Sequence, residues 1–309
     1  MHARPAETEP VTGRMRAFDG VGLRYALYGR EKARATVMIV AGRSEFIEKY
    51  AETVLDLRRA GYAVAVLDLR GQGGSDRRPE DRNIGHIERF SDYPRDILDF
   101  LEQHVRGTMP APCFLLGHSL GGLIALSAAE SGRERFAGLV LAAPFVGLRH
   151  DRYPTWLIRS AAWLACHTGR GGRPTGTARA APPRFEDQRH TSDRIRYERN
   201  LQAARHDPPY LLGPVSYGWL SACIGEIKRM TKPERLASIS CPVLVLSGGR
   251  DSVIPADAQA RLAERLGAHH VVLPESGHEI FQEADATRDI ALEATIEFLD
   301  AHSAATDNG

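Results

Sequence analysis

Apolar segments of strand length alternate along this chain with segments of helical periodicity. The segments with the composition of buried strands are Ala35–Ala41, Tyr62–Asp68, Cys113–Leu116, Phe136–Ala143, Pro242–Leu246 and His270–Leu273. Helical periodicity fills most of the intervals between them, at Phe46–Arg59, Tyr93–Val105, Leu120–Glu130, Pro255–Leu266 and Arg288–Leu299. Strands that alternate with helices pair in parallel, because each helix carries the chain back across a face of the sheet. We therefore predict an α/β fold with a mostly parallel central sheet flanked by helices.

Residues 149–235 interrupt this alternation. Three helices are predicted there, at Tyr153–Cys166, Ser192–His206 and Ser216–Arg229, with a loop rich in Gly, Pro and Arg at Gly169–Pro183. Because strands of the sheet precede and follow this region, we interpret it as a helical cap inserted between two strands. The α/β core then consists of a first part, residues 1–148, and a second part, residues 236–309.

The composition excludes several classes of protein. Of the 309 residues, 43% are hydrophobic and 26% are charged, which excludes a disordered or collagen-like chain. Residues 1–16 lack the apolar core of a signal peptide, and the apolar run at residues 138–148 is too short to span a bilayer. The four scattered cysteines form no C-x-x-C pair, so we expect reduced thiols and a cytoplasmic protein.

The motif with the most chemical content is G-x-S-x-G at residues 117–121, where a predicted strand meets a helix rich in Ala and Leu. At such a junction the serine occupies a sharp, strained turn that exposes its hydroxyl above the sheet. The alternative is a glycine-rich turn with an incidental serine. The placement between strand and helix favours Ser119 as a nucleophile.

A serine nucleophile needs a base that takes its proton and an acid that orients the base. In this kind of fold the acid and the histidine follow the serine in that order, each on a loop after a strand. Asp251 follows the strand at 242–246, and His278 follows the strand at 270–273. Taken alone, Asp251 could complement the start of a helix and His278 could be a surface histidine. Their order and placement together predict a triad of Ser119, Asp251 and His278.

The tetrahedral intermediate of acyl transfer needs two N–H donors that point at its oxyanion. The residue after the nucleophile, Leu120, supplies one backbone N–H in folds of this kind, and a turn after an early strand supplies the other. That turn is Gly42-Arg43-Ser44-Glu45, which follows the strand at 35–41. We assign the second donor to the Arg43 backbone N–H.

These motifs resemble the lysophospholipase and monoacylglycerol-lipase branch of the serine α/β-hydrolases, and the bacterial lysophospholipases most closely. The resemblance runs from about Phe18 to the end of the chain. Besides the triad loops, the matching stretches are residues 42–45, 49–51, 68–75, 117–122, 191–194, 196–197 and 213–214, with Trp219. Monoacylglycerol lipases usually have His-Gly in the oxyanion turn, whereas this chain has Ala41-Gly42, and the departure favours the lysophospholipase branch.

The resemblance implies a serine esterase that cleaves a lysophospholipid or a monoacylglycerol through an acyl-enzyme, without a metal or organic cofactor. It also implies that Glu45 lines the end of the pocket that holds the alcohol; the alternative is a solvated loop carboxylate. A thioesterase or a lipid acyltransferase would use the same triad. A non-catalytic binding module with this fold would have a damaged triad, and the sequence has an intact one.

The predicted cap differs in charge from the rest of the chain. Residues 149–235 contain 16 Lys and Arg against 8 Asp and Glu, within a chain of net charge +1. This excess either favours peripheral contact with an anionic membrane surface or reflects a general preference for Arg, since 36 of the 40 Lys and Arg residues are Arg. Trp156 and Trp163 lie seven residues apart on one helix face, where they line an acyl channel, touch a membrane or pack the cap onto the core. No recognised nucleic-acid-binding motif accompanies the basic residues, so a nucleic-acid partner is not expected, and the sequence leaves the oligomeric state open.

Overall fold

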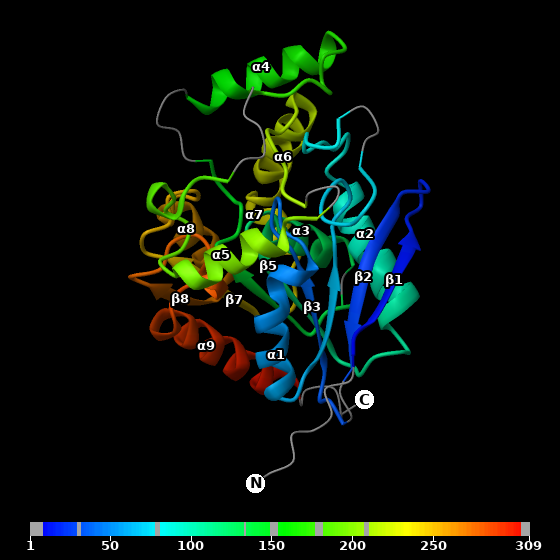
Figure 1. The fold of residues 1–309 in the computed structure, drawn as a ribbon, viewed down its shortest axis with the longest axis vertical. Helices are drawn as coiled ribbons and strands as arrows, with labels where there is room; N and C mark the ends of the chain where they lie inside the picture. Colours follow the sequence, from blue (N-terminus) through cyan, green and yellow to red (C-terminus); the bar gives the residue numbers. More distant parts are fainter. Residues whose placement is uncertain are drawn as a thin grey trace.

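A computed structural model describes residues 9–29, 32–77, 81–132, 134–148, 154–176, 182–206 and 210–303. In these residues an eight-stranded sheet has the order β1-β2-β4-β3-β5-β6-β7-β8 (Figure 1). The strands are β1 (Val11–Arg16), β2 (Gly22–Tyr28), β3 (Thr36–Val40), β4 (Ala63–Leu67), β5 (Cys113–His118), β6 (Gly138–Ala142), β7 (Val243–Gly248) and β8 (His269–Leu273). β1 and β2 pair antiparallel, as do β2 and β4, and the other neighbours pair in parallel. The predicted mostly parallel α/β fold is confirmed.

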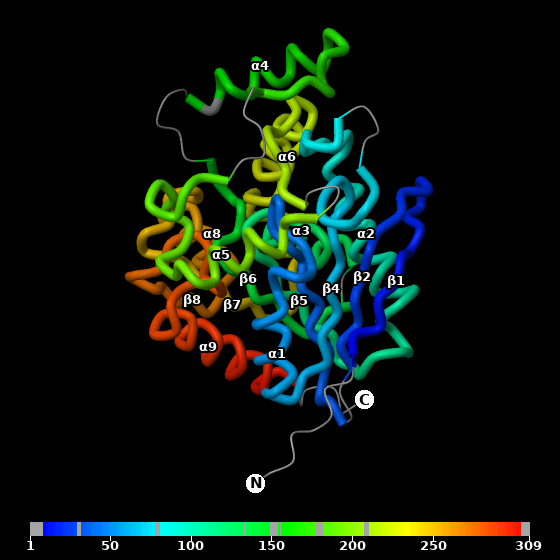
Figure 2. The backbone as a smooth tube through the Cα atoms, in the orientation of Figure 1, coloured from blue at the N-terminus to red at the C-terminus, as the bar shows by residue number. Residues whose placement is uncertain are grey.

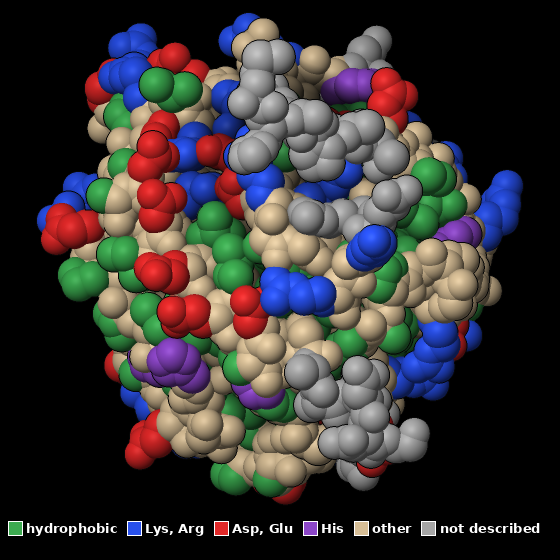
Figure 3. All heavy atoms as spheres, turned by 90° about the horizontal axis from the view of Figure 1, so that it is seen from below, with side chains coloured by type: hydrophobic (Ala, Val, Ile, Leu, Met, Phe, Trp, Pro, Cys, Tyr) green, Lys and Arg blue, Asp and Glu red, His purple; other side chains and the backbone are tan. Residues whose placement is uncertain are grey.

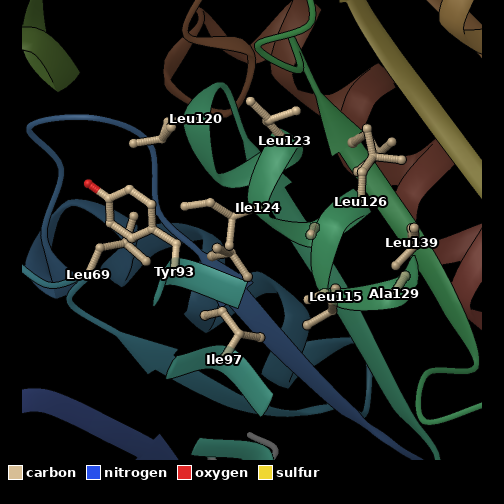
Figure 4. Close-up of a cluster of buried hydrophobic side chains, with 14 of the residues drawn as sticks. Leu69, Tyr93, Ile97, Leu115, Leu120, Leu123, Ile124, Leu126, Ala129 and Leu139 are labelled. Carbon is tan, nitrogen blue, oxygen red and sulfur yellow. The ribbon is translucent and has the colours of Figure 1, made fainter. Parts of the chain in front are cut away.

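Helices cover both faces of this sheet. The core helices are α1 (Ala51–Arg59), α2 (Asp92–Phe100), α3 (Leu120–Ser131), α7 (Pro233–Leu236), α8 (Ala256–Leu266) and α9 (Asp285–Ser303). Along β3, Met38 and Val40 contribute to the core on the side of α2, α3 and α8, whereas Val37 and Ile39 contribute to the core on the side of α1 and α9. This alternation follows from the two-residue period of a strand, which turns successive side chains to opposite faces. Figure 4 shows part of the first core, where side chains of α2 and α3 pack together above the sheet.

The cap helices lie between β6 and β7 in the chain. They are α4 (Thr155–His167), α5 (Arg194–Ala203) and α6 (Tyr217–Met230). Figures 1 and 2 show α4 at one end of the molecule, with α6 between it and the sheet. The predicted helical insertion between two strands is therefore present. Whether residues 149–235 behave as a separate unit stays a prediction.

Capping residues account for small differences between the predicted and observed cap helices. The prediction placed Ser192 and Ser216 inside helices. Instead α5 begins at Arg194, because the Asp193 carboxylate accepts a hydrogen bond from the Arg196 backbone N–H at 2.8 Å. Likewise α6 begins after Ser216, whose hydroxyl accepts a hydrogen bond from the Trp219 N–H at 3.0 Å. Short polar side chains satisfy the free N–H groups of a first turn from the position just before it.

Two further comparisons concern segments near the cap and α2. The predicted start of the first cap helix, Tyr153, and part of the predicted loop 169–183 lie outside the described residues. The predicted helix at residues 93–105 ends as a regular α-helix at Phe100 and continues as a π-helical turn, Leu101–Val105. Among the described residues, no helix combines the length and the apolar character that crossing a bilayer requires.

Arg196 of α5, itself buried, joins the cap to the core through a cluster of carboxylates at the surface. Its guanidinium donates to both Glu52 carboxylate oxygens, at 2.9 and 2.6 Å, and to Asp285 at 2.6 Å. It also donates to the Glu283 backbone carbonyl at 2.8 Å. The Arg196 side chain is only 10% exposed. A single residue therefore ties α5 to α1 and to the start of α9.

We predict that Arg196→Met lowers the free energy of unfolding by about 2 kcal/mol, because it removes the cation that Glu52 and Asp285 share and the donor to the Glu283 carbonyl, while Arg199 still pairs with Glu52. Chemical denaturation monitored by circular dichroism measures the change. Arg194→Met is the matched control: the Arg194 side chain is half exposed and pairs with the exposed Glu186 and Glu198, so its loss should cost less than about 1 kcal/mol. Equal effects of the two substitutions would contradict this assignment.

Candidate active site

The predicted nucleophile occupies a strained turn between β5 and α3. Ser119 has φ +51° and ψ −115°, a conformation that costs a non-glycine residue about 1–3 kcal/mol. Two glycines allow the chain to pass closely here. A Cβ at Gly117 would lie 2.5 Å from the Gly121 carbonyl oxygen, and a Cβ at Gly121 would lie 1.9 Å from that of Val40. The G-x-S-x-G pattern therefore has a steric cause at both glycine positions.

The structure brings the three residues predicted as a triad together. The Ser119 hydroxyl lies 2.9 Å from His278 Nε2, and His278 Nδ1 lies 3.0 Å from an Asp251 carboxylate oxygen. The residues follow the ends of β5, β7 and β8, which meet at the same edge of the sheet. The His278 and Asp251 side chains are both buried. This arrangement gives the hydroxyl a base within hydrogen-bond reach and gives the base an orienting carboxylate.

Asp251 is held as a carboxylate by its surroundings. Burial alone would raise its pKa, but His278 and the backbone N–H groups of Val253 and Ile254 outweigh burial and lower it. Those two N–H groups donate to one carboxylate oxygen at 2.8 and 3.0 Å. The Gln259 side chain donates to the other oxygen at 3.1 Å. With its remaining lone pairs occupied in this way, the carboxylate keeps a fixed direction toward His278.

The turn after β3 presents the second candidate oxyanion donor. Ser44 has φ +64°, and its left-handed backbone is held from both sides: its N–H donates to Gln72 at 3.2 Å and its hydroxyl accepts from the Leu212 N–H at 2.8 Å. No hydrogen bond among the described residues uses the backbone N–H of Arg43. Leu120 is the first residue of α3, where helix geometry leaves the N–H without an acceptor inside the helix. The structure thus has two unused N–H groups at the predicted positions.

Glu45 lies behind this turn and does not line the larger pocket that opens beside it. One of its carboxylate oxygens accepts hydrogen bonds from the Gly42 N–H and the Tyr50 hydroxyl. The other oxygen accepts from the Lys49 ammonium at 2.7 Å and from His118 Nδ1 at 2.9 Å. Glu45 is 3% exposed. Both readings of the sequence, a contact with the substrate alcohol and a solvated carboxylate, differ from this placement.

His118, Lys49 and Glu279 complete a buried charge cluster that sequence reasoning missed. His118 Nε2 donates to the backbone carbonyl of His278 at 3.0 Å, and Lys49 also pairs with Glu279. Burial lowers the pKa of His118, but Glu45 outweighs this and raises it to about 9. In the sequence, the four-residue spacing of Glu45 and Lys49 indicates only the ion pair between these two residues. The rest of the cluster depends on contacts between distant loops.

A pocket opens beside the oxyanion turn, between the core and the cap. It has a volume of about 420 Å³, and its apolar lining includes Phe46, Leu201, Leu211, Leu212 and Pro214. Arg43, Ser44, Lys49 and Glu279 supply polar groups on the core side. The pocket is therefore mostly apolar with a few placed polar groups, as expected for a small-molecule site.

The two tryptophans predicted as substrate contacts lie away from this pocket. Trp156 is 64% exposed and Trp163 is 55% exposed, both on α4. Trp156 lines a different cavity, between α4 and α6, with Arg159 and Lys228. Trp163 packs against His167 one turn further along the same helix, with ring centroids 3.9 Å apart. Neither tryptophan therefore lines the pocket beside the oxyanion turn.

Comparison with known proteins places the chain in a family. A family model described as "Serine aminopeptidase, S33" (Hydrolase_4) matches residues 31–285. The chain belongs to this family. It is 30% identical to lysophospholipase L2 of Escherichia coli K12, with 94% of this chain and 87% of that protein covered. It is 25% identical to the monoacylglycerol lipase of Mycolicibacterium smegmatis, with 82% and 84% covered.

Solved structures agree in fold. A soluble variant of the monoglyceride lipase from Saccharomyces cerevisiae superposes with a TM-score of 0.76 at 21% identity, covering 96% of this chain and 98% of that one. The monoacylglycerol lipase of Paleococcus ferrophilus gives a TM-score of 0.70 at 23% identity, covering 91% and 99%. This Hydrolase_4 member thus has the α/β-hydrolase fold, and its curated relatives carry the names of carboxylic ester hydrolases. The chain is an enzyme of that class.

The raised pKa of His118 gives a testable dependence on pH. A folded-state value of about 9, above the ordinary 6.5, means that the protonated form stabilises the fold fully below pH 6.5. That stabilisation is lost as the pH rises through about 9, when His118 can no longer donate to both Glu45 and the His278 carbonyl. We predict a fall in both stability and activity near pH 9, measured by thermal unfolding and by rate profiles.

Removal of the Glu45 charge should move this fall to lower pH, because Glu45 is what raises the pKa of His118. We expect Glu45→Gln to shift the alkaline limb toward neutral pH, with the His118 titration followed by NMR. Glu275→Gln is the control, since Glu275 is exposed and pairs with Arg250 at the surface. An alkaline limb at the same pH in Glu45→Gln as in the unmodified enzyme would contradict the prediction.

Proposed function

We propose that this enzyme hydrolyses the ester of a single-chain lipid, a lysophospholipid or a monoacylglycerol, through an acyl-enzyme intermediate. The observation that carries the proposal is the continuous hydrogen-bonded path from Ser119 through His278 to Asp251. The oxyanion turn, through Arg43 and Ser44, lines a pocket whose mostly apolar surface suits an acyl chain. The names of the relatives support a lipid ester as substrate.

In the first half of the proposed reaction, Ser119 Oγ attacks the acyl carbonyl carbon while His278 Nε2 takes the hydroxyl proton. The carbonyl oxygen gains negative charge and accepts hydrogen bonds from the backbone N–H groups of Arg43 and Leu120. Asp251 stabilises the imidazolium formed in this step. Collapse of the intermediate breaks the bond to the alcohol oxygen, which receives the proton from His278, and leaves the acyl group on Ser119.

In the second half, water enters in place of the alcohol. His278 takes a proton from the water, the hydroxide adds to the acyl carbon, and the same two N–H groups hold the oxyanion. Collapse returns the proton to Ser119 Oγ and releases the fatty acid. A lysophospholipid is favoured over a monoacylglycerol by the Ala41-Gly42 sequence in the oxyanion turn and by the similarity to lysophospholipase L2.

We predict that Ser119→Ala lowers kcat by about six orders of magnitude, as removal of the nucleophile of a cooperating triad does. The same variant should no longer react with a fluorophosphonate probe, detected by mass spectrometry of the intact protein. Ser160→Ala, on the exposed side of α4, is the control and should label as fast as the unmodified enzyme. Covalent labelling of Ser119→Ala at the unmodified rate would refute Ser119 as nucleophile.

Product analysis separates hydrolysis from the other reactions that the same triad could catalyse. The proposal requires free fatty acid as the main product from lysophospholipid or monoacylglycerol in water. Transfer of the acyl chain to an added lipid alcohol in preference to water would make the enzyme an acyltransferase. Faster turnover of an acyl thioester than of every oxygen ester with the same chain would make it a thioesterase.

We further propose that the cap contacts an anionic lipid surface. α4 presents large exposed apolar side chains at one end of the molecule, namely Trp156, Leu157, Trp163 and Leu164. Residues 149–235 have a net charge of +8, whereas acidic and basic side chains are interspersed on the face opposite the cap (Figure 3). Exposed Trp and Leu side chains next to cations are typical of helices that lie at a membrane interface. This contact would bring the pocket to its substrate.

We predict that replacing both Trp156 and Trp163 by Ser weakens binding to vesicles with anionic lipids by at least about tenfold, because two large apolar side chains no longer enter the interface. Sedimentation with vesicles at low salt measures the change. Ile290→Ser, which removes an exposed apolar side chain from α9, is the control and should bind normally. Equal binding of the unmodified enzyme to neutral and anionic vesicles at low salt would refute the electrostatic part of the proposal.

A further inference from the structure

Arg43 places a cation without a carboxylate partner at the wall of the pocket. One guanidinium nitrogen donates to the backbone carbonyl of Gly213, which lines the same pocket. The guanidinium carbon lies 5.8 Å from the centre of the Trp219 ring. The Nε–H is buried and has no hydrogen-bond partner, and no acidic side chain among the described residues pairs with Arg43. Part of the hydrogen-bonding capacity is therefore unused, and no carboxylate among the described residues neutralises the charge.

Most other buried cations among the described residues, Arg77 excepted, are paired with carboxylates. Arg70 pairs with Asp96 and Asp19, and Arg24 pairs with Asp68 and Glu48. Lys49, the other cation that lines the pocket among the described residues, pairs with Glu45 and Glu279. The carboxylate partners of Arg24, Arg70 and Lys49 outweigh burial and raise the pKa of each. Burial lowers the pKa of Arg43, as it does that of Arg77. An arginine still keeps its proton under these conditions, so the pocket contains one unneutralised positive charge.

The position of Arg43 relative to the reaction identifies what this charge can bind. Its backbone N–H is the proposed donor to the oxyanion, so its side chain extends from a point next to the scissile carbonyl. In a lysophospholipid the glycerol unit separates that carbonyl from a phosphate, and a guanidinium offers several N–H donors in one plane that suit phosphate oxygens. A monoacylglycerol has a neutral hydroxyl in place of the phosphate.

We propose that the Arg43 guanidinium binds the phosphate of the substrate and so selects esters whose alcohol half carries a phosphate over neutral esters. This inference rests on the proposed function, since it needs the ester at Ser119, and it deepens that function by naming the alcohol half. Arg43 is then a specificity-determining residue with two parts: its backbone serves the reaction of any ester, and its side chain serves phosphate esters.

A purely structural role for Arg43 is the competing explanation, and Arg77 provides the comparison. Arg77 also lacks a carboxylate partner among the described residues and donates to backbone carbonyls, including that of Tyr210 at 3.0 Å. Its Nε–H is also buried without a partner. Both arginines therefore attach the 210–213 segment of the cap to the core. Only Arg43 lines the pocket.

The test compares one lysophospholipid and one monoacylglycerol with the same acyl chain, using the full-length enzyme and the variants Arg43→Gln, Arg43→Lys and Arg77→Gln. We expect Arg43→Gln to lower kcat/KM for the lysophospholipid by about 10- to 100-fold more than for the monoacylglycerol, the range for one hydrogen bond to a charged group. The selectivity of Arg43→Lys should lie between that of the unmodified enzyme and that of Arg43→Gln, because lysine keeps the charge. Arg77→Gln should leave the ratio of the two kcat/KM values unchanged.

A second measurement asks whether the site recognises the phosphate itself. Glycerol 3-phosphate should inhibit monoacylglycerol hydrolysis by the unmodified enzyme competitively, and more weakly in Arg43→Gln. Inorganic phosphate with the same effect would assign the site to free phosphate and overturn selection of a lipid headgroup. If Arg43→Gln does not fold, Arg43→Lys and this inhibition of the unmodified enzyme decide the question.

The outcomes distinguish the inference from the function on which it rests. If the unmodified enzyme hydrolyses neither lipid, the proposed function fails. If it hydrolyses monoacylglycerol but not lysophospholipid, the function stands and the phosphate site is refuted. If Arg43→Gln lowers kcat/KM for both lipids by the same factor, or if Arg77→Gln changes the ratio as much, Arg43 is a structural residue.

Discussion

The arrangement of the site depends on one buried group of four charges. Its members come from four places in the chain. They are Glu45 in the oxyanion turn, Lys49 in the helical turn just before α1, His118 at the end of β5 and Glu279 in the loop that carries His278. With His118 protonated, two positive and two negative charges balance. A buried charge without a partner would be very costly, so each member holds the others in place. The cluster therefore fixes the oxyanion turn, the turn that carries Ser119 and the loop that carries His278 relative to one another.

Buried polar contacts also connect the cap to the loop that carries His278. The Thr191 hydroxyl donates to the Gln282 carbonyl at 2.6 Å, and the Ser192 N–H donates to the Glu283 carboxylate at 2.8 Å. Glu283 also accepts from the Gly277 N–H at 2.6 Å, one residue before His278. A single buried carboxylate thus joins the cap to the loop that holds the base. The stretch at 191–194 that resembles lysophospholipases consequently has a structural reason in this chain.

The sequence was sufficient to predict the order of strands and helices in the core and the site residues that directly follow strands. The parallel sheet, the insertion before β7 and the meeting of Ser119, Asp251 and His278 follow from strand–helix alternation, because parallel strands end at a common edge. The sequence was not sufficient for Glu45 or for the two tryptophans of α4. Whether Glu45 faces the pocket depends on Lys49, Tyr50 and His118, whose approach no local pattern encodes.

Backbone strain occurs at the site itself. Among the described residues five non-glycine residues have positive φ; Ser44, Ser119 and Ala143 lie at or next to the site, whereas Lys32 and Glu134 lie elsewhere. The strain at Ser119 is supported by backbone bonds to β6 and beyond: its N–H donates to the Ala142 carbonyl at 2.9 Å, and its carbonyl accepts from the Phe145 N–H at 2.9 Å. The direction of the nucleophile is thus set by the rigid ends of β5 and β6, whereas the pocket wall comes largely from the cap. Changes in the cap can therefore alter which molecule enters the pocket without moving the Ser119 hydroxyl.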